Sequence, residues 1–398
     1  MNKLSDRINQ LSESATLAMA AKAREYKAKG INIISLSLGE PDFKTPQHIQ
    51  DAAKAAIDSG AYFTYPPVPG YPDLRKALAE KLQRENNISC NENNIVVSTG
   101  AKQSLANVML SLVNPGDEVI IFSPYWVSYM ALVELTQAKA VEIKGSIENN
   151  FKATAAQLEA AITDKTRVVI YSSPCNPTGA VFSREELKAI AAVLQKNKHV
   201  ITIADEIYEH INFSGEAVSL ASFPEVAEQV VTVNGFSKGF AMTGWRLGYI
   251  CAPEWIAKAC NKMQGQFTSG ANGIAQRAAL AAITSDLEPT RKMTEAYHRR
   301  RNLVLELLKE IPDLKTYTPN GAFYILPDVS AYFGRSFDGN VISNSDDLAL
   351  FLLDHARVSV VTGDAFGAPE CIRISYAASE EDLKEALKRI KEALAKLR

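Results

Sequence analysis

Short apolar runs alternate with amphipathic stretches along the chain up to Gly248. Runs rich in β-branched residues, each followed by small or polar residues, predict buried strands at 95–98, 118–122, 141–143, 166–172, 200–204 and from Val231 onward. Helical spacing of apolar residues lies between them, at 46–59, 72–86, 157–162 and 184–197, and again after residue 104. Strands that alternate with helices predict a mainly parallel sheet with helical crossovers, and hence an α/β fold.

The pattern changes before and after this region. Residues 12–29 form an alanine-rich helical stretch, and 31–38 alternate as a short strand. Thr45 is expected to cap the helix over 46–59, with Pro46 in its first turn. Beyond Gly248 the pattern is helical at 254–264, 274–283 and 287–310, then mixed, with strands at 323–326, 358–361 and 371–375 and helices at 346–355 and 379–397.

Length and composition narrow the possibilities. A chain of 398 residues exceeds the roughly 250–300 residues at which single cores stop growing, so two domains are expected. The net charge of −2 argues against a nucleic-acid-binding protein. No apolar run reaches the roughly 18 residues of a membrane span. The first residues lack the apolar core of a secretory signal, which favours a cytoplasmic protein.

The cysteines and histidines do not form a metal-binding pattern. The five cysteines are scattered, without a C-x-x-C pair, and the five histidines show no ligand spacing. This arrangement is typical of a protein from a reducing compartment, and we expect neither a disulfide framework nor a metal site.

Polar and aromatic side chains follow the predicted strands where each strand ends. These residues are Lys102, Trp126, Asn176, Asp205, Tyr208 and Lys238. Ligands of open parallel sheets bind beyond the carboxyl ends of the strands, so one shared site is expected there.

The stretch 231–248 contains the residue with the most specific chemical prediction. A buried strand runs into Ser237-Lys238-Gly239, and Arg246 follows. One interpretation is an amine held in a cleft to form a Schiff base, with Ser237 and Arg246 holding a phosphate; the other is a surface loop with two ordinary basic residues. Gly100 and Ala101, between a strand and a helix, offer an anion site or an ordinary turn.

A pyridoxal phosphate site requires a particular set of groups. It needs an amine for the aldehyde, a carboxylate beside the pyridine nitrogen, donors to the phenolic oxygen, an aromatic ring on its face and a phosphate cup. Lys238 could supply the amine and Asp205 the carboxylate. Asn176 and Tyr208 could donate to the phenolic oxygen, and Trp126 could face the ring. The phosphate could be held by Gly100, Ala101, Ser237 and Arg246.

Motifs along nearly the whole chain carry a family resemblance. They are Gly-Glu-Pro-Asp-Phe (39–43), Thr-Tyr-Pro-Pro (64–67), Thr-Gly-Ala-Lys-Gln (99–103), Ser-Pro-Tyr-Trp-Val-Ser-Tyr (123–129), Asn-Pro-Thr-Gly-Ala-Val (176–181), Asp-Glu-Ile-Tyr-Glu (205–209), Ser-Lys-Gly-Phe-Ala-Met-Thr-Gly-Trp-Arg-Leu-Gly-Tyr (237–249) and Arg-Ile-Ser-Tyr-Ala (373–377). In this order they resemble the class I, fold type I pyridoxal-phosphate aminotransferases, most closely the bacterial aspartate aminotransferases of the aspartate/prephenate branch.

The resemblance implies an architecture and further roles. It implies a large domain over 46–289, with a mainly parallel seven-stranded sheet between helices, and a smaller α+β domain from 1–45 and 290–398. Arg373 and Asn176 would bind the substrate α-carboxylate, with the Gly39 backbone beside it. Tyr65 would reach the cofactor phosphate of the other subunit, which requires a homodimer.

Substrate choice depends on the distal group. The segment 264–272 lacks the arginine that some aspartate aminotransferases place there, and the resemblance assigns the distal carboxylate to Lys102, supported by Thr16 and beside Trp126. We therefore expect ping-pong transamination between aspartate and 2-oxoglutarate, with Lys238 moving the proton at Cα. Prephenate or aromatic keto acids as acceptors, and a C–S lyase on the same fold, remain alternatives.

Overall fold

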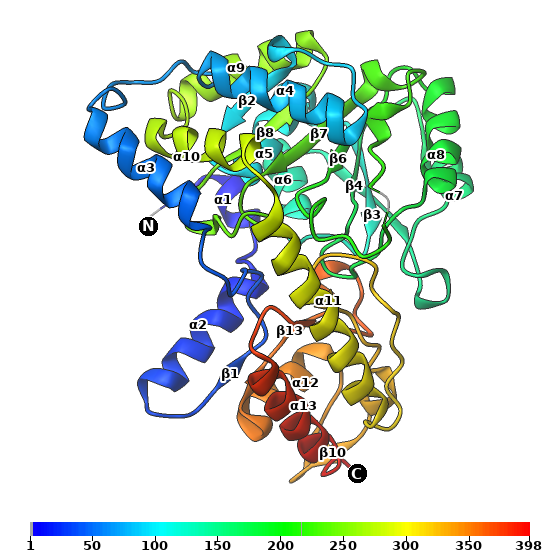
Figure 1. Cartoon of the computed structure of the whole chain (residues 1–398). Coiled ribbons are helices and arrows are strands. Elements are labelled where there is room, and N and C mark those ends of the chain that lie inside the picture. The colour runs from blue at the N-terminus through cyan, green and yellow to red at the C-terminus, as the bar shows by residue number, and fades with distance from the viewer. Residues whose placement is uncertain (1–2, 216) are drawn as a thin grey trace.

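A seven-stranded sheet forms the centre of the computed structural model, which describes residues 3–215 and 217–398 (Figure 1). Its strand order is β2-β8-β7-β6-β5-β3-β4. The strands are β2 (Ile95–Ser98), β3 (Glu118–Ser123), β4 (Lys139–Lys144), β5 (Thr166–Ser172), β6 (Ile201–Asp205), β7 (Val230–Gly235) and β8 (Gly248–Cys251). The α/β fold with a mainly parallel sheet is thus confirmed.

β8 is the strand that the sequence pattern did not locate. It pairs antiparallel with both β2 and β7, with Cys251 opposite Ile95 and Thr232. It is four residues long, like β2, but its sequence Gly-Tyr-Ile-Cys contains a single β-branched residue, so it lacks the run of such residues that identified β2. The chain beyond Gly248 therefore first completes the sheet before it becomes helical.

Alternate side chains of the strands face two different cores, as the period of a strand requires. Ile120 and Phe122 pack into one core and Val119 and Ile121 into the other. Helices cover both faces, which explains why β2 and β3 are buried at every position, whereas the edge strand β4 carries exposed Lys139 and Lys144. The first core takes side chains from α3 (Gln47–Ser59), α4 (Pro72–Asn86), α7 (Ala155–Ala161), α8 (Arg184–Lys196) and α10 (Gly273–Thr284), and the second from α5 (Ala101–Leu112), α6 (Ser128–Thr136) and α9 (Glu254–Phe267).

A third core gathers both ends of the chain. Figure 1 shows the long helix α11 (Glu288–Lys309) running from beside the sheet to this lower part. The other elements here are α2 (Ala15–Ala28), β1 (Ile34–Ser35), β9 (Tyr324–Ile325), α12 (Ser345–Phe351), β12 (Val358–Ser359), β13 (Val361–Thr362), β14 (Ile372–Ser375) and α13 (Glu380–Leu394). The domain boundaries after residues 45 and 289 stay a prediction.

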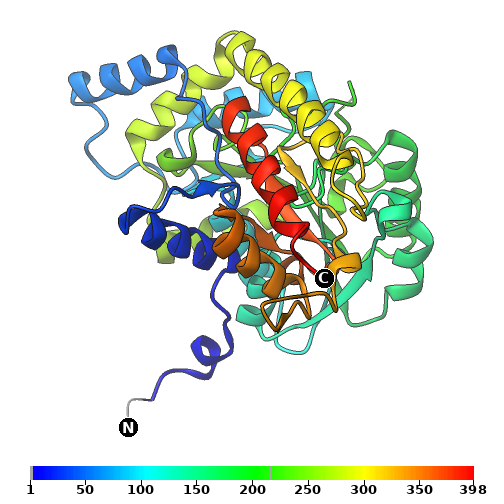
Figure 2. The same ribbon diagram turned by 90° about the horizontal axis from the view of Figure 1, so that it is seen from below.

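The segment before α2 leaves the body of the molecule. It contains the short helix α1 (Asp6–Gln10), none of whose residues is buried, and Figure 2 shows it extending away from the rest of the chain. Within residues 3–215 and 217–398, no helix is long and apolar enough to span a membrane.

The predicted cap of the helix at 46–59 is wrong. Pro46 itself is the N-cap residue of α3 and makes no side-chain cap. The Thr45 hydroxyl instead donates 2.7 Å to the Ala241 carbonyl and accepts a bond of 3.0 Å from Trp245 Nε1. A tertiary contact has replaced the local one, because the loop after Lys238 offers Thr45 both a donor and an acceptor.

Candidate active site

One cavity of about 720 Å³ lies at the carboxyl ends of the parallel strands. Asp205 ends β6, Asn176 follows β5 and Lys238 follows β7, which is the edge where the sheet topology predicts a ligand. Of the predicted site residues, those that line the cavity are Thr16, Gly39, Ala101, Lys102, Trp126, Asn176, Asp205, Tyr208, Ser237, Lys238, Arg246 and Arg373.

The Lys238 amine is held inside this cavity. Its Nζ donates to the Gly39 carbonyl, and no carboxylate among the described residues forms an ion pair with it. Burial lowers the pKa of the amine to about 8, although the nearby charge of Glu40 opposes this change. An amine with this pKa is partly uncharged near neutrality and can act as a nucleophile or a base.

Asp205 is a buried carboxylate without a cationic partner. It is 4% exposed; Tyr129 donates 2.7 Å to Oδ2, and the Ile207 N–H donates 3.2 Å to Oδ1. Burial raises the pKa of this carboxyl to about 6, although the two hydrogen bonds oppose the rise. A positively charged group in the cavity would stabilise the ionised form.

Arg373 brings an unpaired positive charge into the same cavity. Its side chain is 1% exposed and donates 2.9 Å to Asn176 Oδ1 and 2.6 Å to the Ser37 carbonyl, while Nε has no partner in the described structure. A buried guanidinium that meets only neutral oxygens can form a two-pronged bond with an anion. Asn176 accepts from Arg373 with its oxygen, which leaves its NH₂ group available to donate.

Arg246 lies at the N-terminus of α5. Gly100 is the N-cap residue with φ of 83°, and a Cβ there would lie 2.5 Å from Arg246 Nη2, so only glycine fits. The guanidinium is exposed and bonded at 2.9 Å to the Thr243 carbonyl. Together with Ser237 and the free N–H groups of the helix, it forms an anion site of the kind that binds phosphate.

Lys102 and Trp126 form another part of the wall. Lys102 Nζ lies 4.9 Å from the centre of the Trp126 ring, an arrangement typical of a cation–π contact. Partial burial of this amine, together with the charge of Arg246, lowers its pKa, although the residue as a whole is exposed. The buried hydroxyl of Thr16 has no hydrogen-bond partner among the described residues and also lines the cavity.

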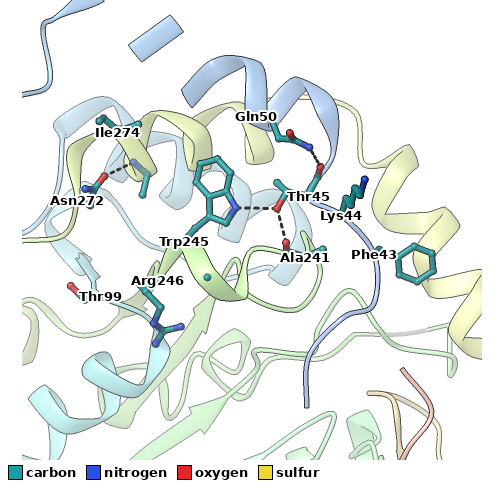
Figure 3. Close-up of a pocket in the computed structure, with 12 residues that line it drawn as sticks. Phe43, Lys44, Thr45, Gln50, Thr99, Ala241, Trp245, Arg246, Asn272 and Ile274 are labelled. Atoms are coloured by element: carbon teal, nitrogen blue, oxygen red, sulfur yellow. Dashed lines mark hydrogen bonds between the residues drawn. The ribbon is translucent and has the colours of Figure 1, made fainter. Parts of the chain in front are cut away.

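Two predicted site residues do not line this cavity. Gly100 directly precedes Ala101 of the cavity wall, whereas Tyr65 lies in the loop before α4. Its side chain is 90% exposed. A second cavity of about 960 Å³ lies on the other side of Arg246 and is lined by Thr45, Thr99, Trp245 and Asn272, among others (Figure 3). Gly244 and Arg246 line both cavities.

The sequence interpretation missed several groups of the site. Tyr129, which bonds Asp205, lies in the motif 123–129 but received no role. Glu40 lines the cavity near Lys238, and Tyr324 contacts Tyr208 and Arg373. A tyrosine inside a predicted strand gives no signal of a functional position. No group of three His, Cys, Asp or Glu side chains that could hold a metal ion occurs in 3–215 or 217–398.

Comparison with known proteins agrees with this geometry. The sequence profile described as aminotransferase class I and II matches residues 31–390. An aspartate/prephenate aminotransferase of Nitrosomonas europaea is 43% identical, over 99% of this chain and 100% of its own. A bifunctional aspartate aminotransferase and glutamate/aspartate-prephenate aminotransferase of Petunia hybrida is 44% identical, over 99% of this chain and 83% of its own.

Solved structures of aspartate aminotransferases are also similar to this chain. The aspartate aminotransferase of Rhizobium meliloti superposes with a TM-score of 0.96 at 40% identity, over the full length of both chains. The aspartate aminotransferase of Thermus thermophilus with maleate superposes with a TM-score of 0.92 at 40% identity, over 99% of this chain and 100% of its own. With matches over nearly its whole length, the chain belongs to the class I and II aminotransferases, which use pyridoxal 5′-phosphate.

Proposed function

We propose that this enzyme transfers the amino group of aspartate to 2-oxoglutarate. The observation that carries the proposal is the presence of two cations, Arg373 and Lys102, in the cavity that holds the Lys238 amine; neither forms an ion pair with a described residue. A dicarboxylate offers one anion to each cation, whereas alanine or phenylalanine offers only one. The names of the Nitrosomonas and Rhizobium relatives, and maleate with the Thermus protein, support a dicarboxylate substrate.

The residues present fit the cofactor of the family. Ala101, Ser237 and Arg246, with Gly100 at the helix terminus, would hold its phosphate. Asp205 would hold the proton on its ring nitrogen, Asn176 and Tyr208 would donate to its phenolic oxygen, and Trp126 would face its ring. When bound, pyridoxal 5′-phosphate supplies an aldehyde that takes up the amino group and a ring that accepts electrons from the bonds at Cα.

The protein's side chains orient the substrate and move its protons. Arg373 holds the α-carboxylate, and the neutral amide of Asn176 beside it adds a donor without a competing charge. Lys238, with its pKa lowered to about 8, would take the proton from Cα of the donor amino acid and pass it to the aldehyde-derived carbon of the cofactor; in the second half-reaction the same amine would move a proton in the opposite direction, to Cα of the product amino acid. Lys102 holds the distal carboxylate, and the Thr16 hydroxyl donates to it.

Removal of the Lys102 charge tests the substrate assignment. In Lys102→Ala the KM for aspartate is expected to rise about 10- to 100-fold, because a hydrogen bond to a charged group contributes about 1.5–3 kcal/mol. The KM for phenylalanine should stay within about twofold, since its side chain offers Lys102 no anion. Steady-state kinetics with both donors measures the difference.

An exposed lysine provides the matched control for this experiment. Lys258→Ala, at a side chain 76% exposed and paired only with Glu254, should leave both constants unchanged. Equal increases for aspartate and phenylalanine in Lys102→Ala would overturn the dicarboxylate assignment.

The proposed enzyme is a homodimer with shared active sites. The loop that carries Tyr65 is held at its base, where Tyr71 N–H donates 2.9 Å to Gln276 Oε1 and Val97 N–H donates 3.0 Å to the Pro69 carbonyl. Its tip, with Phe63 66% exposed, suits the cavity beside Arg246 of a second copy (Figure 3). Sedimentation should give the mass of a dimer, and a monomer at micromolar concentration would contradict the shared site.

Prephenate is a second candidate acceptor. The names of the Nitrosomonas and Petunia relatives include it, and its two carboxylates match the same pair of cations. Amino transfer from glutamate to prephenate, measured beside transfer to oxaloacetate, tests this possibility.

The five buried, unpaired cysteines support a cytoplasmic location.

A further inference from the structure

Tyr324 joins the groups proposed to bind the cofactor and the substrate. It lies on β9, in the core formed by the two ends of the chain, and its side chain is 0% exposed. Its hydroxyl lies 2.7 Å from the hydroxyl of Tyr208, which comes from the segment after β6. The two phenols therefore join the segment after β6 to β9 by a direct hydrogen bond.

The ring of Tyr324 supports Arg373. The centre of the guanidinium lies 4.5 Å from the ring centre of Tyr324 and 4.8 Å from that of Phe366. A desolvated cation over an aromatic face gains electrostatic stabilisation without a counter-ion. Arg373 can therefore stay buried while its charge remains available to a carboxylate.

Tyr324 also explains the glycine at position 39. A Cβ on Gly39 would lie 2.3 Å from the Tyr324 hydroxyl oxygen, so any larger residue would displace one of them. The Gly39 carbonyl accepts the hydrogen bond from Lys238. One side chain thus contacts Tyr208 and Arg373 and fixes the position of the backbone that holds the amine.

The hydroxyl of Tyr324 has a specific electronic consequence. A phenol has one proton, so when Tyr208 donates to the cofactor's phenolic oxygen its own oxygen is left to accept from Tyr324. Hydrogen bonds in such a chain polarise one another, and a hydroxyl that accepts a bond becomes a stronger donor. Both phenols are buried, at 3% and 0% exposure, and Tyr324 is the hydrogen-bond partner of the Tyr208 hydroxyl in the described structure.

We propose that Tyr324 is a positioning residue: its hydroxyl strengthens the hydrogen bond from Tyr208 to the cofactor, and its ring holds Arg373 for the substrate carboxylate. This inference rests on the proposed roles of Tyr208 and Arg373. The two parts of the side chain have separable effects, so each can be tested by its own variant.

Tyr324→Phe tests the hydroxyl. It retains the ring but weakens the Tyr208 donor, so the deprotonated phenolic oxygen of the bound cofactor becomes less stable. The midpoint pH of the absorbance change of the bound cofactor should rise by about half a pH unit, while the KM for aspartate stays within about twofold. Spectrophotometric titration of the holoenzyme in the absence of substrate measures the midpoint.

Tyr324→Leu tests the ring. Loss of the aromatic face beneath Arg373 should raise the dissociation constant for maleate, a dicarboxylate that cannot react, about tenfold. Tyr324→Phe should leave that constant unchanged. If the phenylalanine variant loses maleate affinity to the same extent, the ring has no separate role and this part of the proposal is wrong.

Three comparison variants make the spectroscopic result decisive. Tyr332→Phe removes another buried hydroxyl of the same core, bonded to the Pro312 carbonyl, and should leave the midpoint unchanged. Tyr208→Phe should raise the midpoint by about one unit or more, and the double variant should show no shift beyond that of Tyr208→Phe alone.

The outcomes separate this inference from the proposed function. If Tyr208→Phe shifts the midpoint and Tyr324→Phe does not, the inference is wrong and the role of Tyr208 stands. If neither variant shifts it, the proposed role of Tyr208 fails as well. A shift by Tyr324→Phe that persists in the Tyr208→Phe background would show that Tyr324 does not act through Tyr208.

Discussion

Two regions meet at the segment 205–210, and they differ in whether their buried charges form ion pairs. Asp205 and Tyr208 line the cavity at the carboxyl ends of the strands, whereas Glu206 accepts a hydrogen bond from Ser219 and Glu209 accepts one from Asn86 of α4. Each region contains a lysine: the half-buried Lys238 in the cavity and the buried Lys81 against Glu209. The two lysines differ in what surrounds them.

The region around Lys81 is a structural network. Lys81, 3% exposed in its side chain, forms an ion pair with Glu209 and donates 2.8 Å to Asn86 Oδ1; Asn86 donates 2.7 Å to the other oxygen of Glu209. Burial alone would raise the pKa of Glu209, but the charges of Lys81 and His210 lower it to about 2. Burial raises the pKa of Glu206 to about 8, so this carboxyl is neutral at pH 7. The network therefore pairs its charges: Lys81 pairs with Glu209 and also lies 3.6 Å from the carboxylate of Glu85.

The cavity keeps its charges unmatched. Lys238 and Arg373 donate to carbonyl and amide oxygens, and Asp205 accepts from a phenol and a backbone N–H. Such an arrangement costs stability for Asp205 and Arg373, because each is buried without forming an ion pair with a described residue. The comparison teaches that buried charged groups which pair with each other maintain the fold. Buried charged groups without a counter-charge indicate where a ligand of opposite charge binds.

Lys238→Ala is expected to have the largest effect. Transamination should fall roughly ten-thousand-fold, because the group that moves the Cα proton is lost, and the absorbance of the lysine-bound cofactor should disappear with it. The thermal midpoint of the cofactor-free protein should not fall, since no ion pair is broken. Activity and spectra beside Lys258→Ala measure this, and full activity would overturn the whole interpretation.

Lys81→Met should affect stability instead. It leaves Glu209 buried without its counter-ion, and breaking such a pair costs about 3–5 kcal/mol. Urea denaturation of the holoenzyme measures the loss. The double variant Lys81→Met/Glu209→Gln should recover part of it, and Lys258→Met should cost less than about 0.5 kcal/mol. If Lys81→Met had the stability of the parent, the network would not support the fold.

The charge of Asp205 should make stability depend on pH, with a smaller effect. Its folded pKa of about 6 lies above the unfolded value, so its stabilising contribution is fully present below about pH 4 and is lost as pH rises through 6. In the cofactor-free protein, Asp205→Asn should therefore gain up to about 3 kcal/mol at pH 8 relative to pH 4. Denaturation of the variant and the parent at pH 4 and pH 8 measures this gain. If the difference in unfolding free energy between variant and parent is the same at both pH values, burial does not destabilise the carboxylate.

Much of the site could be predicted from the sequence because its residues follow recognisable strands. Asp205 and Asn176 stand directly after β-branched runs, and a parallel topology brings such ends together. Arg373 had no local signal of this kind and was assigned a role only through the family resemblance. Tyr324 and Tyr129 were missed, since a buried tyrosine usually serves packing.

Local and tertiary information thus contributed different things. The sequence by itself determined the α/β class and the position of the Lys238 amine after a strand. It also indicated the cofactor-binding chemistry of the neighbouring residues. All of these depend on residue type and short-range periodicity. Only the tertiary structure decided that Thr45 bonds Trp245 instead of capping a helix, that Gly248 begins a seventh strand, and that Tyr324 contacts Tyr208 and Arg373. Each is a contact between residues far apart in the chain, and its energy depends on distances and burial that no local pattern contains.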